Sequence, residues 1–109
     1  MVTIPFSKWL EIELKTAKIV SAEDIAGKDK LFKLTLEIGE EKRTLVAGLK
    51  PMYSKEELVG KTVVLFSNLE PKKIAGIESQ GMVLAATDKV GRPILLTTDK
   101  ESESGAKIM

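Results

Sequence analysis

The sequence predicts an all-β protein, a five-stranded barrel with one short helix between its third and fourth strands. Two observations carry this prediction. Apolar and polar residues alternate along several short segments, which is typical of half-buried strands. A helix N-terminal motif at residues 54–57 separates the third of these segments from the fourth. Because no internal repeat, low-complexity tract or linker interrupts the middle of the chain, we expect one domain.

The first three strands are expected in the N-terminal half. Residues 12–20 mix β-branched and apolar side chains, and their apolar phase slips between Leu14 and Ala17, which suggests a bulge or bend. Residues 32–38 alternate cleanly. After a polar turn at 39–42, residues 43–47 read as the returning strand. The second and third strands are therefore predicted to form a hairpin.

The helix and the last two strands follow. Ser54 and Glu57 form a capping box, and Gly60 is suited to end a helix of two turns at most. Residues 62–66 are a nearly continuous apolar strand, 67–81 a long loop, and 82–86 the fifth strand. This element order is that of an oligonucleotide-binding (OB) barrel. The strand count alone fits other small barrels, and the position of the helix favours the OB type.

We expect a barrel at about residues 12–87, with extensions at 1–11 and 88–109. Ile4, Phe6, Trp9 and the run at 94–96 are apolar residues within these extensions. They either close over the end of the barrel or pair with their equivalents in a second copy of the chain. The sequence leaves both arrangements open.

Composition excludes several kinds of site. The chain has no cysteine and no histidine, which rules out disulfides, thiolate zinc sites and histidine-dependent catalysis. The 16 acidic residues leave carboxylate chemistry open, but no arrangement of them supports an enzyme. No apolar run approaches the roughly 20 residues of a membrane helix, and the start lacks a secretory signal. We therefore expect a cytoplasmic, non-catalytic protein without a cofactor and away from membranes.

The net charge of +1 means that any nucleic-acid surface has to be local. OB barrels bind ligands on the face of strands two and three and on the loops that flank it. Basic, polar and apolar candidates fall there in three groups: Lys28 and Lys30 in the first loop, Lys33 and Arg43 on the hairpin face, and Asn68, Lys72, Lys73, Ser79, Gln80 and Met82 in or just after the long loop. Cationic side chains displace counterions from phosphates, and polar ones fix the register of the bound strand.

A solvated surface explains these lysines equally well from charge alone. Lysine is common on any soluble protein, and four acidic residues lie close by in the sequence: Glu23, Asp24, Asp29 and Glu78. The aromatic residues indicate which kind of nucleic acid the chain would bind. Phe32 and Phe66 fall at core positions, so the chain lacks a platform for stacking single-stranded bases. A folded RNA, read by shape and backbone, suits the chain better.

Residues 68–86, NLEPKKIAGIESQGMVLAA, carry a resemblance to one family. They closely resemble the tRNA-binding domain found at the C-terminus of methionyl-tRNA synthetases, as a separate synthetase β subunit, in free-standing tRNA-binding proteins and in CsaA export chaperones. Residues 29–31 and 43–49 match two further family blocks. Two segments depart from the pattern: 15–17, where the family usually has arginine-valine-glycine, and 25–28, where it has a longer loop motif. The second departure leaves the course of the first loop open.

The resemblance implies a non-catalytic barrel that binds the outer, elbow side of tRNA without strong sequence preference, usually as a homodimer. The residues at matching positions are Lys30, Arg43, Asn68, Lys72, Ser79 and Met82. Ser79 and Gln80 would bond RNA or tie the loop to itself, and Met82 would contact a base, order the loop or pack at the barrel end. We expect an accessory domain or β subunit of methionyl-tRNA synthetase that raises the local concentration of tRNA. The alternative is a CsaA-like chaperone for unfolded polypeptides, which requires exposed apolar surface.

Overall fold

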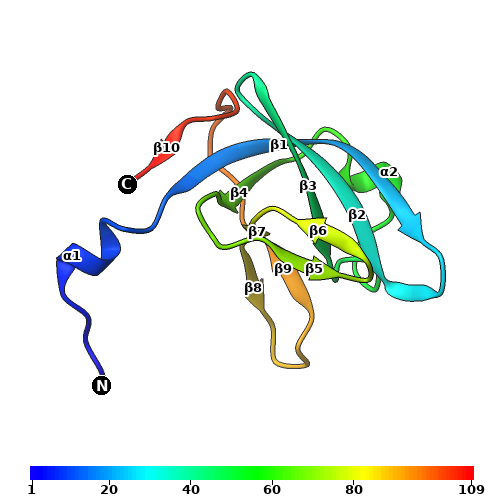
Figure 1. Cartoon of the computed structure of the whole chain (residues 1–109), viewed down its shortest axis with the longest axis horizontal. Helices are drawn as coiled ribbons and strands as arrows, with labels where there is room; N and C mark the ends of the chain where they lie inside the picture. The colour runs from blue at the N-terminus through cyan, green and yellow to red at the C-terminus, as the bar shows by residue number, and fades with distance from the viewer.

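The structure, a computed structural model, describes all 109 residues and shows a β-barrel with short appendages (Figure 1). In chain order the elements are α1 (Phe6–Trp9), β1 (Leu14–Ile25), β2 (Lys28–Ile38), β3 (Glu41–Ala47), α2 (Lys55–Leu58), β4 (Thr62–Phe66), β5 (Lys72–Ile74), β6 (Ile77–Ser79), β7 (Met82–Val83), β8 (Ala85–Thr87), β9 (Pro93–Leu95) and β10 (Lys107–Ile108). The main sheet has the order β3-β2-β1-β4-β7, β10 pairs with β1, and two hairpins join β5 to β6 and β8 to β9. The all-β OB prediction is confirmed. No helix of the chain has the length and apolar character needed to cross a membrane.

The long strand β1 connects the two sides of the barrel. Its residues 14–18 pair with β4, and residues 18–25 pair with β2. A register shift between Ile19 and Ser21 bends the strand where it changes partner. The bulge predicted between Leu14 and Ala17 is wrong, because pairing with β4 is regular there. The apolar phase slips for another reason: Thr16 and Ala17 are both buried, and Thr16 lies beneath the C-terminal tail.

The core lies inside the barrel and is set by the alternation predicted for the second strand. The buried apolar cluster consists of Ala17, Ile19, Phe32, Leu34, Leu36, Ile38, Leu45, Leu49, Leu58, Val63, Leu65 and Val83. The residue Leu58 comes from α2, whose capping box is confirmed: the Ser54 hydroxyl accepts from the Glu57 amide at 3.2 Å, and the Glu57 carboxylate accepts from the Ser54 amide at 2.8 Å. This box fixes the start of α2 and so directs Leu58 into the barrel end.

The connection between β1 and β2 is shorter than expected. Ile25 pairs with Lys28, which leaves Ala26 and Gly27 as the turn. Gly27 has a φ of +75°, a conformation that favours glycine. Lys28 and Lys30 therefore begin β2 and do not lie in a loop.

Residues 79–83 close the barrel between β3 and β4. On one side, the Gln80 amide donates to the Thr44 carbonyl at 2.9 Å and the Gln80 side-chain oxygen accepts from the Thr44 amide at 3.0 Å. On the other side, β7 pairs with β4. Gly81 lies between them at a φ of +124°, and a Cβ there would stand 2.8 Å from the Phe66 carbonyl oxygen. The barrel is thus closed by one backbone bond and one side-chain bond of Gln80 in place of a continuous strand ladder, and the chain path there needs glycine at position 81.

The predicted fifth strand is split at Leu84. The Leu84 amide donates to the Val64 carbonyl at 2.9 Å, and its own carbonyl accepts from the Leu96 amide at 3.2 Å. After this residue the chain leaves β4 and forms the β8–β9 hairpin, which projects from the barrel (Figure 1). The apolar run at 94–96 is therefore partly a strand, β9, as its composition suggested.

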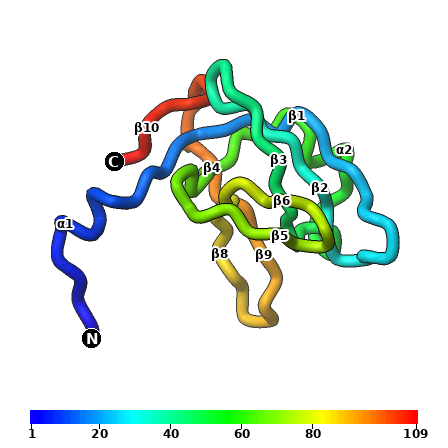
Figure 2. Tube along the Cα trace, in the orientation of Figure 1, coloured from blue at the N-terminus to red at the C-terminus, as the bar shows by residue number.

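The two terminal extensions differ in what they contact. The tail returns to the barrel, where β10 pairs with β1 on the edge that β2 leaves free. The N-terminal arm with α1 stands away from the barrel, as the tube in Figure 2 shows, and its apolar residues Ile4, Phe6 and Leu10 are exposed. The chain covers its own barrel with one extension only.

Candidate nucleic-acid interface

Four strands bring Lys33 and Lys72 to one surface. Lys33 on β2 is the cross-strand neighbour of Val46 on β3. The Val46 amide donates to the Ser79 hydroxyl on β6 at 3.0 Å, and Ser79 is the neighbour of Lys72 on β5. The β5–β6 hairpin therefore lies along the outer edge of β3, beside the hairpin of β2 and β3 (Figure 2). The predicted long loop carries its lysines on this added ribbon.

Lys28 and Lys30 lie at the start of β2, beside the residue that follows β3. Gly48, which directly follows β3, lies against Lys30: a Cβ at Gly48 would stand 3.9 Å from the Lys30 carbonyl oxygen. Asp29 falls between the two lysines, where residues 29–31 have no cross-strand partner on β1 or β3. The lysines of β2 and β5 make no ion pair within 4.0 Å; we call these five residues, Lys28, Lys30, Lys33, Lys72 and Lys73, the lysine patch.

The acidic residues near the patch are engaged to different degrees. Asp24 holds Lys50 and Lys55, each at 2.7 Å, and hydrogen bonds from these two ammonium groups lower the pKa of Asp24 to about 2. Glu23 is the cross-strand neighbour of Lys33, and Glu78 that of Lys73, without forming an ion pair. The hydrogen bond to Asp24 also raises the pKa of Lys55. Lys50 and Lys55 thereby share one carboxylate, whereas the five patch lysines have no ion-pair partner.

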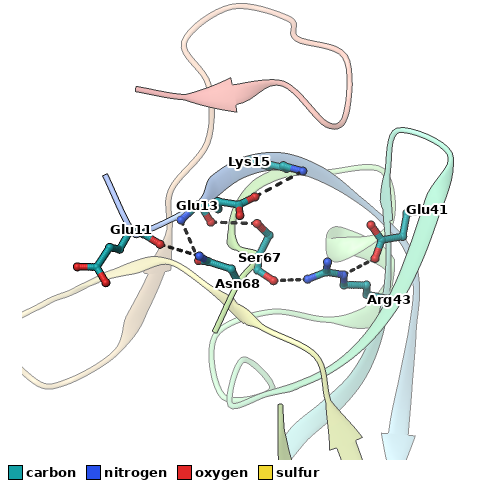
Figure 3. A network of polar contacts seen from close by, with 7 residues as sticks. All are labelled: Glu11, Glu13, Lys15, Glu41, Arg43, Ser67 and Asn68. Atoms are coloured by element: carbon teal, nitrogen blue, oxygen red, sulfur yellow. Dashed lines mark hydrogen bonds and ion pairs between the residues drawn. The ribbon is translucent and has the colours of Figure 1, made fainter. Parts of the chain in front are cut away.

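Arg43 does not share the outer face with Lys33, and that expectation is wrong. Arg43 is the cross-strand neighbour of Leu36, a core residue, so its side chain leaves the inner face of β3. Its Nε donates to Glu41 at 2.6 Å and its Nη1 donates to the Ser67 carbonyl (Figure 3). Only 23% of the side chain is exposed. Arg43 therefore ties β3 to the end of β4 at the mouth of the barrel.

Asn68 uses both ends of its amide within the chain. Its oxygen accepts from the Glu13 amide at 2.8 Å, and its nitrogen donates to the Glu11 carbonyl at 2.6 Å (Figure 3). The Ser67 amide and hydroxyl both donate to the Glu13 carbonyl, at 2.8 and 3.0 Å. These bonds extend the pairing of β1 with β4 by side chains. Sequence reasoning missed Ser67 and Glu13, because their partners lie more than fifty residues away.

Ser79, Gln80 and Met82 occupy the segment that docks the β5–β6 hairpin. Ser79 is 4% exposed, and its hydroxyl accepts from the Val46 amide. The Gln80 side-chain oxygen accepts from the Thr44 amide. Met82 is 54% exposed at the end of β7. The residues proposed from the sequence thus separate into three sets: the five unpaired lysines of β2 and β5, the exposed Met82, and Arg43, Asn68, Ser79 and Gln80, which bond within the chain.

Comparisons with known proteins agree with this architecture. A family model described as a putative tRNA-binding domain matches residues 14–107. The methionine–tRNA ligase of Caldanaerobacter subterraneus subsp. tengcongensis is 49% identical over 105 residues, which are 96% of this chain and 16% of that protein. The chain thus spans about a sixth of the length of this relative.

Two solved structures share the fold over their whole length. A MetRS-related protein from Pyrococcus horikoshii has a TM-score of 0.93 and 34% identity, covering 100% of both chains. The chaperone CsaA from Bacillus anthracis has a TM-score of 0.91 and 27% identity, covering 99% of this chain and 100% of its own. The first of these is the nearer of the two in sequence.

Proposed function

Because this chain belongs to the family of tRNA-binding domains, we propose that it is a non-catalytic module that binds folded tRNA through its lysine patch. The observation that carries the proposal is that the five lysines of β2 and β5 form no ion pair, although acidic residues are near. Free lysines release condensed counterions when phosphates bind, and this gain does not depend on sequence. In this proposal Arg43, Asn68, Ser79 and Gln80 act by positioning the strands, and Met82 lies at the edge of the contact.

A folded RNA fits this surface better than an extended single strand. Proteins that bind single strands without sequence preference stack bases on exposed aromatic rings. Phe32, the aromatic residue on β2, is 2% exposed, and the exposed Phe6 lies on the N-terminal arm. Contact with phosphates along a folded backbone needs no such platform.

We further propose that the chain serves a methionyl-tRNA synthetase, as its β subunit or accessory domain, and so takes part in protein biosynthesis in the cytoplasm. Relatives named methionine–tRNA ligase contain this region as 14–17% of their length. A tethered tRNA-binding domain raises the local concentration of tRNA without taking part in the chemistry. The apparent KM for tRNA then falls while kcat stays constant.

This role is tested by aminoacylation kinetics with a methionyl-tRNA synthetase catalytic subunit. Adding the chain should lower KM for tRNA, and the double variant Lys30→Glu, Lys72→Glu should lose about tenfold or more of that effect, about 1.4 kcal/mol. Lys100→Glu is the matched control, because Lys100 is exposed and distant in sequence from the patch. An unchanged KM with the wild-type chain would refute the synthetase role.

We also propose that the chain works as a homodimer. The N-terminal arm carries the exposed residues Ile4 and Phe6 and leads to Leu10, which lines a hollow of about 280 Å³ together with apolar Ile12, Leu14 and Ile108 and charged Glu13, Lys15 and Lys107. Exposed apolar residues beside a partly apolar hollow are suited to an isologous contact between two copies. A dimer would carry two lysine patches and gain affinity for RNA through avidity.

The alternative function is that of a chaperone. Two solved structures described as CsaA chaperones match with TM-scores of 0.91 and 0.89, at 27% and 29% identity. The synthetase relative is more similar, at 49%, and free lysines add nothing to the capture of apolar polypeptides. Suppression of aggregation at stoichiometric amounts of the chain, without any mobility shift of tRNA, would favour the chaperone function.

A further inference from the structure

An apolar hollow of about 220 Å³ lies beside the lysine patch, between β3, the β5–β6 hairpin and the β8–β9 hairpin. Its buried lining includes Val46, Leu49 and Val83, and its exposed lining includes Gly48, Met82 and Ala85. An apolar cavity of roughly 150 Å³ accommodates a benzene ring. The hollow is therefore large enough for one aromatic heterocycle that enters from the exposed side.

Three lysines of the patch are direct neighbours of residues that line this hollow. Lys33 is the cross-strand neighbour of Val46, and Lys72 is that of Ser79. Gly48 lies against Lys30. A ligand seated in the hollow would thus have cationic side chains on the strands around it.

The hollow offers no free side-chain group for directional recognition. Ser79 is the one polar side chain that lines it. Its hydroxyl already accepts from the Val46 amide at 3.0 Å and lies 3.5 Å from the Gly81 carbonyl oxygen. The remaining contacts are aliphatic or come from the Met82 thioether, which packs adaptably against flat rings. A ring bound in the hollow would be held by its apolar faces and not by the hydrogen-bond donors and acceptors on its edge.

We propose that this hollow receives one unpaired nucleobase of an RNA whose phosphates lie on the lysine patch. The proposal rests on the proposed function. A nucleotide combines a flat, weakly polar ring with an anionic phosphate, and the hollow with its three lysines is complementary to both. An apolar peptide side chain would fill the hollow and leave these lysines without counterpart. Because no side chain reads the base edge, all four bases should bind alike.

The test compares two RNA hairpins that differ by one nucleobase. One carries a single 2-aminopurine bulge, and the other carries an abasic nucleotide at the same position. The wild-type chain should bind the first about tenfold more tightly, because the ring moves from water into the apolar hollow. Binding should also change the fluorescence of the 2-aminopurine, since its stacking environment changes.

Two neighbouring alanines provide a matched pair of variants. Ala85→Leu would fill the hollow. It should abolish the preference for the 2-aminopurine hairpin and leave the affinity for the abasic hairpin unchanged. Ala86→Leu is the control, because Ala86 follows on the same strand, is exposed and does not line the hollow. If Ala85→Leu fails to fold, Met82→Ala provides a second test at an exposed position. It should reduce the preference for the hairpin that carries the base.

The possible failures are distinguishable. Equal affinity of the wild-type chain for the two hairpins would overturn the nucleobase proposal and leave the tRNA-binding function standing. No binding of either hairpin or of tRNA would overturn the proposed function itself. If an uncharged apolar peptide displaces the bulged hairpin from the wild-type chain but not from the Ala85→Leu variant, the hollow takes polypeptide and the proposal is wrong.

Discussion

At the scale of single residues, Asp24 divides the lysines of this protein into paired and free ones. Lys50 and Lys55 both contact its carboxylate at 2.7 Å. Lys30, the third residue of β2, follows the turn from the end of β1 that carries Asp24 and has no such partner. Whether a lysine is paired with Asp24 depends on which side chains the β1–β2 hairpin and α2 bring together. The pairing therefore arises only in the folded chain.

This pairing predicts a dependence of stability on pH. Its two lysine partners lower the pKa of Asp24 from 3.8 to about 2, so its contribution to folding is present above pH 4 and is lost as the pH falls towards 2. Replacing Asp24 by Asn should therefore lower the urea midpoint by a constant amount above pH 5, and this difference should shrink between pH 4 and 2. Asp99→Asn is the control, because Asp99 is exposed and forms no ion pair. A difference that does not vary with pH would contradict the assignment.

The orientation of Arg43 could have been predicted from the sequence. Arg43 is two residues from Leu45, so the two side chains share a face of the strand, and Leu45 is in the core. The ion pair with Glu41 and the bond to the Ser67 carbonyl could not be predicted, because they depend on the end of β4 reaching β3. The bonds of Asn68 to residues 11 and 13 depend in the same way on tertiary structure.

At the scale of elements, alternation predicted the strands of the main sheet but not the β5–β6 hairpin. The two strands have three residues each and no apolar alternation that stands out. They form because Ala75 and Gly76 turn the chain with positive φ values of 53° and 79°, and because Ser79 and Gln80 bond to β3. A strand stabilised mainly by docking to another strand leaves little periodicity in its sequence.

The C-terminal tail is a second element that the sequence did not specify. Thr16, near the start of β1, donates its hydroxyl to the Glu103 carbonyl at 2.7 Å and accepts from the Ala106 amide at 2.9 Å. Backbone bonds join Thr16 to Gly105 and Ala106 at 2.7 and 2.9 Å. This one buried threonine therefore holds the turn that leads into β10.

Replacing Thr16 by Val should loosen this tail. The substitution keeps the shape and removes both side-chain bonds, so we expect a loss of about 1–3 kcal/mol in unfolding free energy. Hydrogen exchange of the amides at 103–108 should accelerate, with tRNA affinity unchanged. Thr35→Val is the matched control, because Thr35 on β2 forms no side-chain hydrogen bond. Equal exchange rates in the tails of the two variants would argue against the role of Thr16.

At the scale of the whole molecule, the order of the elements was enough to predict the OB barrel, since few small folds place a helix after the third strand. How the barrel closes was not predictable. The bridge at Gln80 and Gly81 consists of one backbone bond, one side-chain bond and one close backbone approach, which no periodicity records. The proposed homodimer belongs to the same scale, because it depends on the arm that the barrel leaves uncovered.

The dimer predicts a specific effect of Phe6, which is 70% exposed on α1. Replacing Phe6 by Ser should shift the chain from dimer to monomer in analytical ultracentrifugation, because the apolar contact between copies is weakened. Val90→Ser is the control: Val90 is 75% exposed at the tip of the β8–β9 hairpin, where no contact is proposed. Sedimentation of the wild-type chain as a monomer at micromolar concentration would refute the dimer.

The central claim is that the free lysines of β2 and β5 bind the phosphates of tRNA. The most direct test is the salt dependence of tRNA affinity, measured by fluorescence anisotropy between roughly 50 and 200 mM salt. If the five lysines each neutralise a phosphate, the logarithm of the binding constant should fall with the logarithm of salt with a slope of about −4. Lys30→Ala should reduce the steepness by about one, and Lys100→Ala should not change it. A slope near zero, or one that Lys30→Ala leaves unchanged, would contradict the account.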